Sequence, residues 1–183
     1  FQINIMLSIT FGIICYMIWL LRPKETTFGW FALSSLLWVL FISNVLTTET
    51  FPYSSSLMAT QANLAFFVLY IVSFCIYLLR FIRTRLAKIE ASIYFATGLA
   101  IACIFSTPQQ FIYFVFPLIF LIYVGLFFFT CIYISYCAIK SRRADYIFLA
   151  ICLIGICSFA VLDILLLLSE STADARPLSP YSS

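Results

Sequence analysis

The chain contains no histidine and only five glycines, and 9% of its 183 residues are charged. Without histidine, this segment has no His-based catalysis, no His metal ligand and no phospho-acceptor histidine. The seven cysteines include no CxxC pair and their number is odd. We therefore predict no disulfide framework, no metal site and no cofactor, and we interpret the cysteines as small hydrophobic residues.

The scarcity of charge is matched by an excess of apolar residues. Charged residues make up about a quarter of an ordinary soluble domain. Here 64% of residues are hydrophobic, 19% are aromatic and the mean hydropathy is +1.13. A soluble domain could not bury that much apolar surface, so the expected partner is the lipid bilayer. The net charge of +3 lies in short connections and forms no basic face. We therefore expect no nucleic-acid partner.

Six apolar runs, each near the roughly twenty residues that cross a bilayer, predict six membrane-spanning helices. They cover residues 3–21, 28–46, 57–81, 91–106, 110–139 and 144–168. The fourth run is short for a hydrocarbon core of about 30 Å, and the fifth is long enough to tilt or to extend beyond it. We predict an all-α fold, a polytopic transmembrane helical bundle, with residues 1–183 forming one transmembrane domain.

Nearly all the basic residues lie in three short stretches between these runs. They are Arg22, Lys24, Arg80, Arg83, Arg85, Lys88, Lys140, Arg142 and Arg143. Short loops rich in Lys and Arg stay on the cytoplasmic side, so these residues predict a multi-pass topology with an extracytoplasmic N-terminus. With six spans, Ser183 returns to the outer side. A cytoplasmic domain would then require a seventh helix, which we expect after the chain end.

Asp163 is the ionisable residue that lies well inside a predicted span. A carboxylate in hydrocarbon costs about 3 kcal/mol on insertion scales, so it needs a partner or a function. Asn44, Asn63 and Asn4 lie near the outer ends of three other predicted helices. The four residues form either a polar pocket for a ligand or signal, or ordinary hydrogen bonds between helices.

Two further features have both a structural and a functional interpretation. Pro117 lies inside the fifth run and predicts a kink, which is either a hinge or a bend that neighbouring helices tolerate. The basic run from Arg80 to Lys88 would form, on a helix, a short strip at the lipid headgroups. We interpret this strip as an orientation anchor, with signal relay as the alternative.

The sequence contains no catalytic arrangement of residues. No lysine lies within a span to form a retinal Schiff base, no glycine-rich phosphate loop occurs, and no two carboxylates pair inside the membrane. Serine and threonine have neither histidine nor a lysine at depth to activate them. We predict that this segment is not an enzyme. Whether the full-length protein is an enzyme stays an open question.

The segment LLRPKETTFGWFAL at residues 20–33, followed by Leu36, Leu37 and Trp38, carries a family resemblance. A first helix ending in Arg, a short loop and a Gly-Trp-Phe-Ala-Leu helix start resemble the bacterial seven-transmembrane receptors with diverse intracellular signalling modules. The helix with Asp163 and the polar loop leading to Tyr181 are similar to the sixth helix and outer loop of that family. The resemblance covers nearly the whole chain.

This resemblance implies a membrane sensor of the bacterial inner membrane, with an unknown extracytoplasmic ligand. A cytoplasmic output domain would follow, either the histidine kinase of a two-component system or a diguanylate cyclase, and the protein would form a homodimer through it. The expected function is a transmembrane signal-sensing module that relays an extracytoplasmic or membrane cue, with a histidine kinase favoured as the output.

Two other functions compete with the sensor. Transporters usually have helices broken at the membrane midplane and internal repeats, and the few glycines and single buried carboxylate disfavour a small-molecule transporter or channel. A passive membrane anchor would only localise the output domain, and signalling would then survive replacement of all the helices by an unrelated anchor.

The substitution Asp163→Asn tests the predicted pocket. It keeps the shape of the side chain and removes its charge, so we expect the signal response of the full-length protein to change while its abundance in the membrane persists. The response is measured at the output domain and the abundance by immunoblotting. If both are unaffected, the pocket prediction is abandoned.

Overall fold

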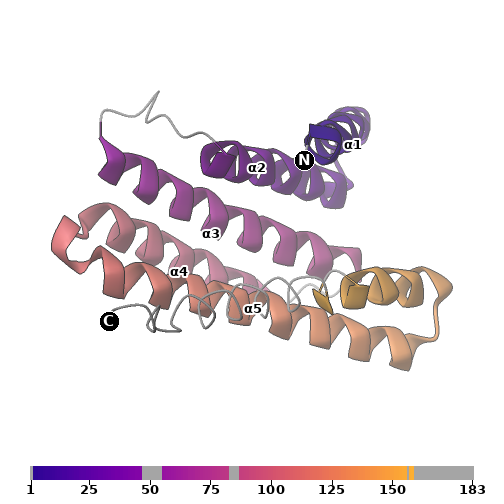
Figure 1. Ribbon diagram of the computed structural model, residues 1–183. Helices are drawn as coiled ribbons and strands as arrows, with labels where there is room; N and C mark the ends of the chain where they lie inside the picture. The colour runs from indigo at the N-terminus through magenta and orange to yellow at the C-terminus, as the bar shows by residue number, and fades with distance from the viewer. Residues whose placement is uncertain (1, 47–54, 83–86, 156, 159–183) are drawn as a thin grey trace, which may run out of the picture. The chain divides into compact units, whose positions relative to one another are not determined.

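The computed structural model describes residues 2–46, 55–82, 87–155 and 157–158, with backbone only for residues 2–4, 45, 46 and 87. Within these ranges the chain is helical and contains no strand, which confirms the predicted all-α fold. The α-helices are α1 (Gln2–Leu21), α2 (Thr26–Leu46), α3 (Ser56–Phe81), α4 (Ala87–Ser106) and α5 (Ile112–Ser141) (Figure 1). A 3-10 turn, η1 (Gln109–Phe111), precedes α5, and a further helix covers Ala144–Gly155.

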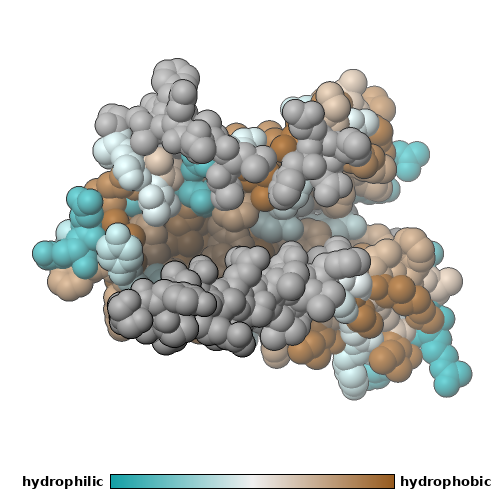
Figure 2. All heavy atoms as spheres, in the orientation of Figure 1, coloured by the Kyte–Doolittle hydropathy of each residue, from teal (hydrophilic) through white to brown (hydrophobic). Residues whose placement is uncertain are grey.

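Length and apolar character decide which of the helices can cross a membrane. Four of them meet this criterion, over Thr26–Asn44, Ser56–Phe81, Lys88–Ser106 and Gln109–Ser141, and Ile5–Leu21 and Ala144–Gly155 are shorter apolar helices among the described residues. Figure 2 shows brown, apolar side chains over much of the visible helix surface and teal, hydrophilic ones towards its edges. Large side chains such as Phe95 and Phe114 point outward. The protein is therefore embedded in a membrane.

Helix α4 is longer than the apolar run from which we predicted it. It begins at Ala87 and has 20 residues, which corresponds to about 30 Å at the helical rise. Its first turn carries Lys88 and Glu90, two residues that a hydropathy criterion assigns to a loop. The helix thus spans a full hydrocarbon core with a charged turn at its start.

The described residues divide into two compact units, one within Phe1–Thr130 and the other within Cys131–Ser183, and α5 contributes to both. A single domain over residues 1–183 stays a prediction. In the second unit, α5 ends at Ser141 and is followed by Arg142, whose φ of 51° is in the left-handed region and whose N–H donates to the carbonyl of Ala138. This conformation stops the helix, and the next helix begins two residues later.

Helix α3 is the centre of the first unit. In the most apolar stretch of α3, 56% of the residues are buried, whereas the corresponding shares in α2 and α4 are 22% and 17%. Helices α2 and α4 both pack on α3, and α1 packs on α2. The first part of α5 meets α3 through stacked rings, with the centroids of Phe67 and Phe120 4.5 Å apart. In lipid, such packing supplies the association that the hydrophobic effect supplies in water.

Small residues bring α1 close to α2. A Cβ atom added at Gly12 would lie 3.1 Å from the Cβ of Ser35, and one added at Gly29 would lie 3.1 Å from the indole ring of Trp19. Each glycine therefore admits a side chain from the other helix so closely that even an added Cβ would require that side chain to move by a few tenths of an ångström. The α1–α2 contact depends on these two positions.

The substitution Gly12→Leu tests this packing. We expect it to destabilise the protein by about 1–3 kcal/mol, because the new side chain overfills a closed contact. Stability is measured as the midpoint of unfolding in an SDS titration followed by circular dichroism. Gly98→Leu is the matched control, since a Cβ at Gly98 has nothing within 4 Å. Equal midpoints for the two variants would contradict the proposed contact.

Candidate functional site

Arg80, in the last turn of α3, holds together the ends of three helices. Its Nη2 lies 3.1 Å from Oε2 of Glu90 in α4, and its Nη1 donates a hydrogen bond of 2.7 Å to the hydroxyl of Thr26 at the start of α2. Its Cζ lies 5.5 Å from the ring centroid of Trp30, one turn further along α2. A single guanidinium thus connects α2, α3 and α4.

Aromatic rings lie around this ion pair. Tyr94 follows Glu90 by one turn of α4, and its ring centroid lies 6.1 Å from that of Trp30. Together Thr26, Trp30, Arg80, Glu90 and Tyr94 form what we call the Arg80 cluster. The planar guanidinium suits this position, because it donates in two directions and lies on an aromatic face at the same time.

The Arg80–Glu90 pair is largely shielded from solvent. The two side chains are 25% and 13% exposed, whereas those of the looser Arg22–Glu25 pair, at 3.8 Å, are 73% and 51% exposed. Withdrawing charges from water makes their attraction stronger and makes the loss of either partner costly. The cluster offers no nucleophile activated by a base. It acts as a polar lock, a set of contacts that holds the ends of α2, α3 and α4 together.

Reading the sequence alone missed this cluster. In the sequence Arg80 is one of nine basic residues that predict the topology, and Glu90 and Thr26 lie 10 and 54 residues away from it. The available signal was a lone acidic residue at the start of an apolar run that directly follows a basic loop.

The other basic residues are placed as follows. Arg22, Lys24, Lys88, Lys140, Arg142 and Arg143 are exposed, and Arg83 and Arg85 lie outside the described residues. The Arg80 cluster brings the start of α2 and the start of α4 to one end of the first unit. This agrees with placing the first two basic loops on the same side of the membrane. Which side that is stays a prediction.

The predicted polar pocket is described only in part. Asp163 lies outside the described residues, and of Asn4 only the backbone, within α1, is described. Asn44 donates through Nδ2 to the carbonyl of Ala59 in α3, at 3.1 Å, so here the amide bonds one helix to another. Asn63 lies one turn after Ala59, and its Oδ1 is buried without a hydrogen-bond partner among the described residues. The structure therefore brings Asn44 and Asn63 to neighbouring turns.

Gln61 is a second polar residue that sequence reasoning missed. It is 5% exposed, and its Nε2 donates to the carbonyl of Ile104 at 3.1 Å and to that of Thr107 at 3.4 Å. The last carbonyls of a helix have no partner within the helix, so Gln61 caps the end of α4. Only the folded chain reveals this role, because Gln61 and Ile104 are 43 residues apart.

Pro117 lies in the second turn of α5 and is exposed. It cannot donate to the carbonyl of Tyr113, which weakens the first turn. Only five residues of α5 precede it. A hinge at Pro117 would therefore move little more than that turn and η1. The hinge stays a prediction.

Comparisons with protein-family models, with curated proteins and with solved structures found no match to this chain.

The substitution Glu90→Gln tests the lock. It leaves the Arg80 charge shielded without its counter-charge, so we expect a loss of roughly 1–3 kcal/mol in unfolding free energy. Glu25→Gln is the matched control, and we expect it to cost less than about 0.5 kcal/mol because its pair is exposed. Both are measured by SDS titration. Losses of equal size would show that the Arg80–Glu90 pair is no more than a surface contact.

Proposed function

We propose that this chain is the transmembrane signal-sensing module of a bacterial inner-membrane protein, with its N-terminus extracytoplasmic. It relays an extracytoplasmic or membrane cue to a cytoplasmic output domain, for which a histidine kinase is favoured over a diguanylate cyclase. The choice of output rests on the family resemblance of residues 20–38.

One observation carries the proposal: α4 is bound to α3 by polar contacts at both of its ends. Gln61 caps the last turn of α4, and Arg80 pairs with Glu90 in its first turn. Between these contacts most of α4 is not buried against other helices, since only 17% of the residues in its apolar stretch are buried. Because its own backbone hydrogen bonds stiffen a helix, we expect α4, held at these two points, to move as one body.

A helix that moves as one body couples the two ends of the first unit. The two contacts of α4 lie about 20–25 Å apart, at the helical rise of 1.5 Å per residue. A shift of α4 relative to α3 at the Gln61 end would therefore also move Glu90, at the other end, relative to Arg80. Arg80 then either follows Glu90 or keeps only Thr26 and Trp30. Two discrete arrangements of this kind are what a helix-shift switch requires.

The Gln61 end also contains groups that a cue could act on. Asn44 lies there, bonded to the carbonyl of Ala59, and so does the Oδ1 of Asn63, which has no hydrogen-bond partner among the described residues. A ligand or water that donates to Asn63 would satisfy a buried acceptor, whose lack of a partner costs about 1–3 kcal/mol. Under this proposal, binding there biases the position of α4.

A double-mutant cycle tests the relay. The full-length protein with Gln61→Leu, Glu90→Gln or both is assayed in native membrane vesicles for autophosphorylation with labelled ATP and for cyclic dinucleotide synthesis from GTP. We expect each single variant to change basal output about fivefold or more, at the low end of known coupling energies. We expect the double variant to change it no further, since both act through α4.

Gln110→Leu and Glu25→Gln serve as controls, because both residues are exposed. Additive effects of Gln61→Leu and Glu90→Gln on output would contradict a relay through α4. Substrate uptake by proteoliposomes, with neither nucleotide product formed, would favour a transporter. Unchanged output in every variant would favour a passive anchor.

A further inference from the structure

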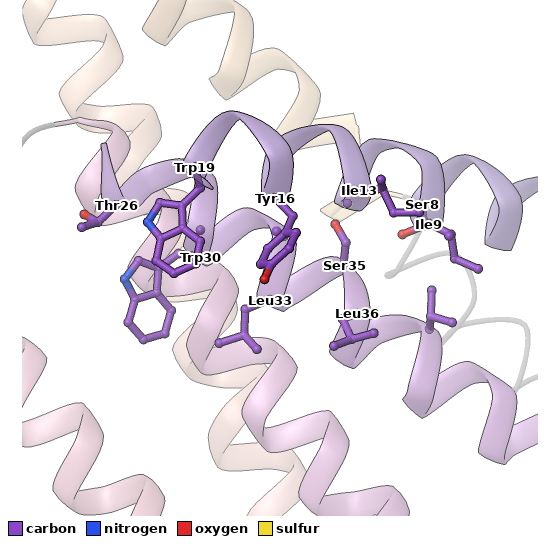
Figure 3. Close-up of a pocket in the computed structure, with 14 residues that line it drawn as sticks. Ser8, Ile9, Ile13, Tyr16, Trp19, Thr26, Trp30, Leu33, Ser35 and Leu36 are labelled. Carbon is purple, nitrogen blue, oxygen red and sulfur yellow. The ribbon is translucent and has the colours of Figure 1, made fainter. Parts of the chain in front are cut away.

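A groove of about 690 Å³ runs along the contact of α1 with α2 (Figure 3). Its volume falls in the range of roughly 300–1,000 Å³ that is typical of ligand sites. The groove lies wholly within the first unit and opens to the side of the helix pair. Its walls are almost entirely apolar, with Tyr16 of α1 and Leu33 of α2 near the middle.

The two ends of the groove differ in polarity. Figure 3 shows Thr26, Trp19 and Trp30 at one end, and Ile9 and Leu36 towards the other. The indole N–H groups of Trp19 and Trp30 donate to no group among the described residues. The Thr26 hydroxyl accepts from Arg80 and keeps its own proton for a further acceptor. Three donors therefore lie at one end of a groove that is otherwise lined mostly by apolar residues, with the hydroxyls of Ser8, Ser35 and Tyr16 elsewhere along it.

Basic side chains lie beside the same end. The loop that joins α1 to α2 starts three residues after Trp19 and carries Arg22 and Lys24, both exposed. Glu25 lies 3.8 Å from Arg22 and opposes it only weakly. Arg80, which is paired with Glu90, lies next to this end of the groove because it donates a hydrogen bond to Thr26. Three cations and two carboxylates leave an excess of positive charge at the polar end.

We propose that this groove binds an acyl chain of an anionic phospholipid whose headgroup lies at the Thr26 end. The polarity profile fits an amphiphile: a long apolar wall, then indole and hydroxyl donors, then cations. Tryptophan is enriched at the level of the lipid headgroups because its side chain is likewise amphipathic, with an apolar ring and a polar N–H group. Basic residues near a membrane surface attract anionic lipid, which makes the headgroup charge part of the recognition.

A second copy of the chain fits the groove less well. Close packing between helices in lipid uses small residues, and of those that line the groove Gly12 and Ser35 are already buried against each other in the α1–α2 contact. A helix laid in the groove would also set apolar side chains against the donors and cations at the Thr26 end. This inference requires only that the protein is embedded in a membrane, and it does not depend on the proposed signalling function.

Tryptophan fluorescence tests the proposal directly, because two of the three tryptophans line the groove and Trp38 does not. The whole protein is placed in nanodiscs as two variants, one with Trp30 alone (Trp19→Phe, Trp38→Phe) and one with Trp38 alone (Trp19→Phe, Trp30→Phe). Each is titrated with phosphatidylglycerol or phosphatidylcholine that is brominated near the headgroup end of its acyl chains. Bromine quenches only tryptophans that it touches.

We expect phosphatidylglycerol to quench Trp30 at about fivefold lower mole fraction than phosphatidylcholine, which is the factor one basic residue near a membrane contributes. The preference should disappear with Arg22→Gln and Lys24→Gln together. It should persist with Lys140→Gln and Arg143→Gln together, which remove the same charge from another loop. We expect no preference at Trp38.

Three results would overturn the proposal. Equal quenching of Trp30 by both lipids would mean that the groove meets bulk lipid only. Equal preference at Trp30 and Trp38 would mean a general enrichment of anionic lipid around the protein. Protection of Trp30 from both lipids, with a dimer in the nanodisc, would mean that a second copy covers the groove.

Discussion

Hydrocarbon supplies no hydrogen-bonding partners, and the polar side chains of this protein are arranged accordingly. Backbone groups are satisfied within the helices, and most hydroxyls follow the same pattern. Thr97, Thr130 and Ser135 each donate to the carbonyl four residues earlier, within their own helix. Such residues make no demand on a neighbouring helix. The few polar side chains that do reach across therefore carry most of the information about how the helices are held.

Those exceptions concentrate on α3. Gln61 and Arg80 lie near opposite ends of this most buried helix, and both bind α4. Their chemistry differs in a way that suits a relay. The Gln61 contact is neutral and caps a helix end, while the Arg80 contact is charged, partly buried and shared with α2. The first is a neutral cap on the last carbonyls of α4, and the second joins Arg80 to Glu90, Thr26 and Trp30 at once.

The α1–α2 pair is held differently, by shape. Gly12 and Gly29 let side chains of the other helix approach closely. A groove runs along one side of this contact. The groove shares Thr26 and Trp30 with the Arg80 cluster. If anionic lipid binds there, its headgroup competes with the Thr26 hydroxyl and the Glu90 carboxylate for the N–H groups of Arg80. Lipid composition would then act on the same contacts that a relay through α4 uses.

The all-α fold and the membrane embedding follow from the sequence, because hydropathy and length are local properties that each run of residues carries by itself. The nine basic residues likewise predict a topology without any contact between helices. The roles of individual residues are another matter. Arg80 and Lys88 belong to one basic stretch, yet of these two only Arg80 forms an ion pair within the part of the chain that the structure describes. Gln61 and Asn63 are two residues apart, yet Gln61 donates to carbonyls of α4 while the Oδ1 of Asn63 has no hydrogen-bond partner among the described residues. Which polar side chain is locked and which is left unpaired depends on the partner helix that faces it, and only the tertiary structure brings that partner into place.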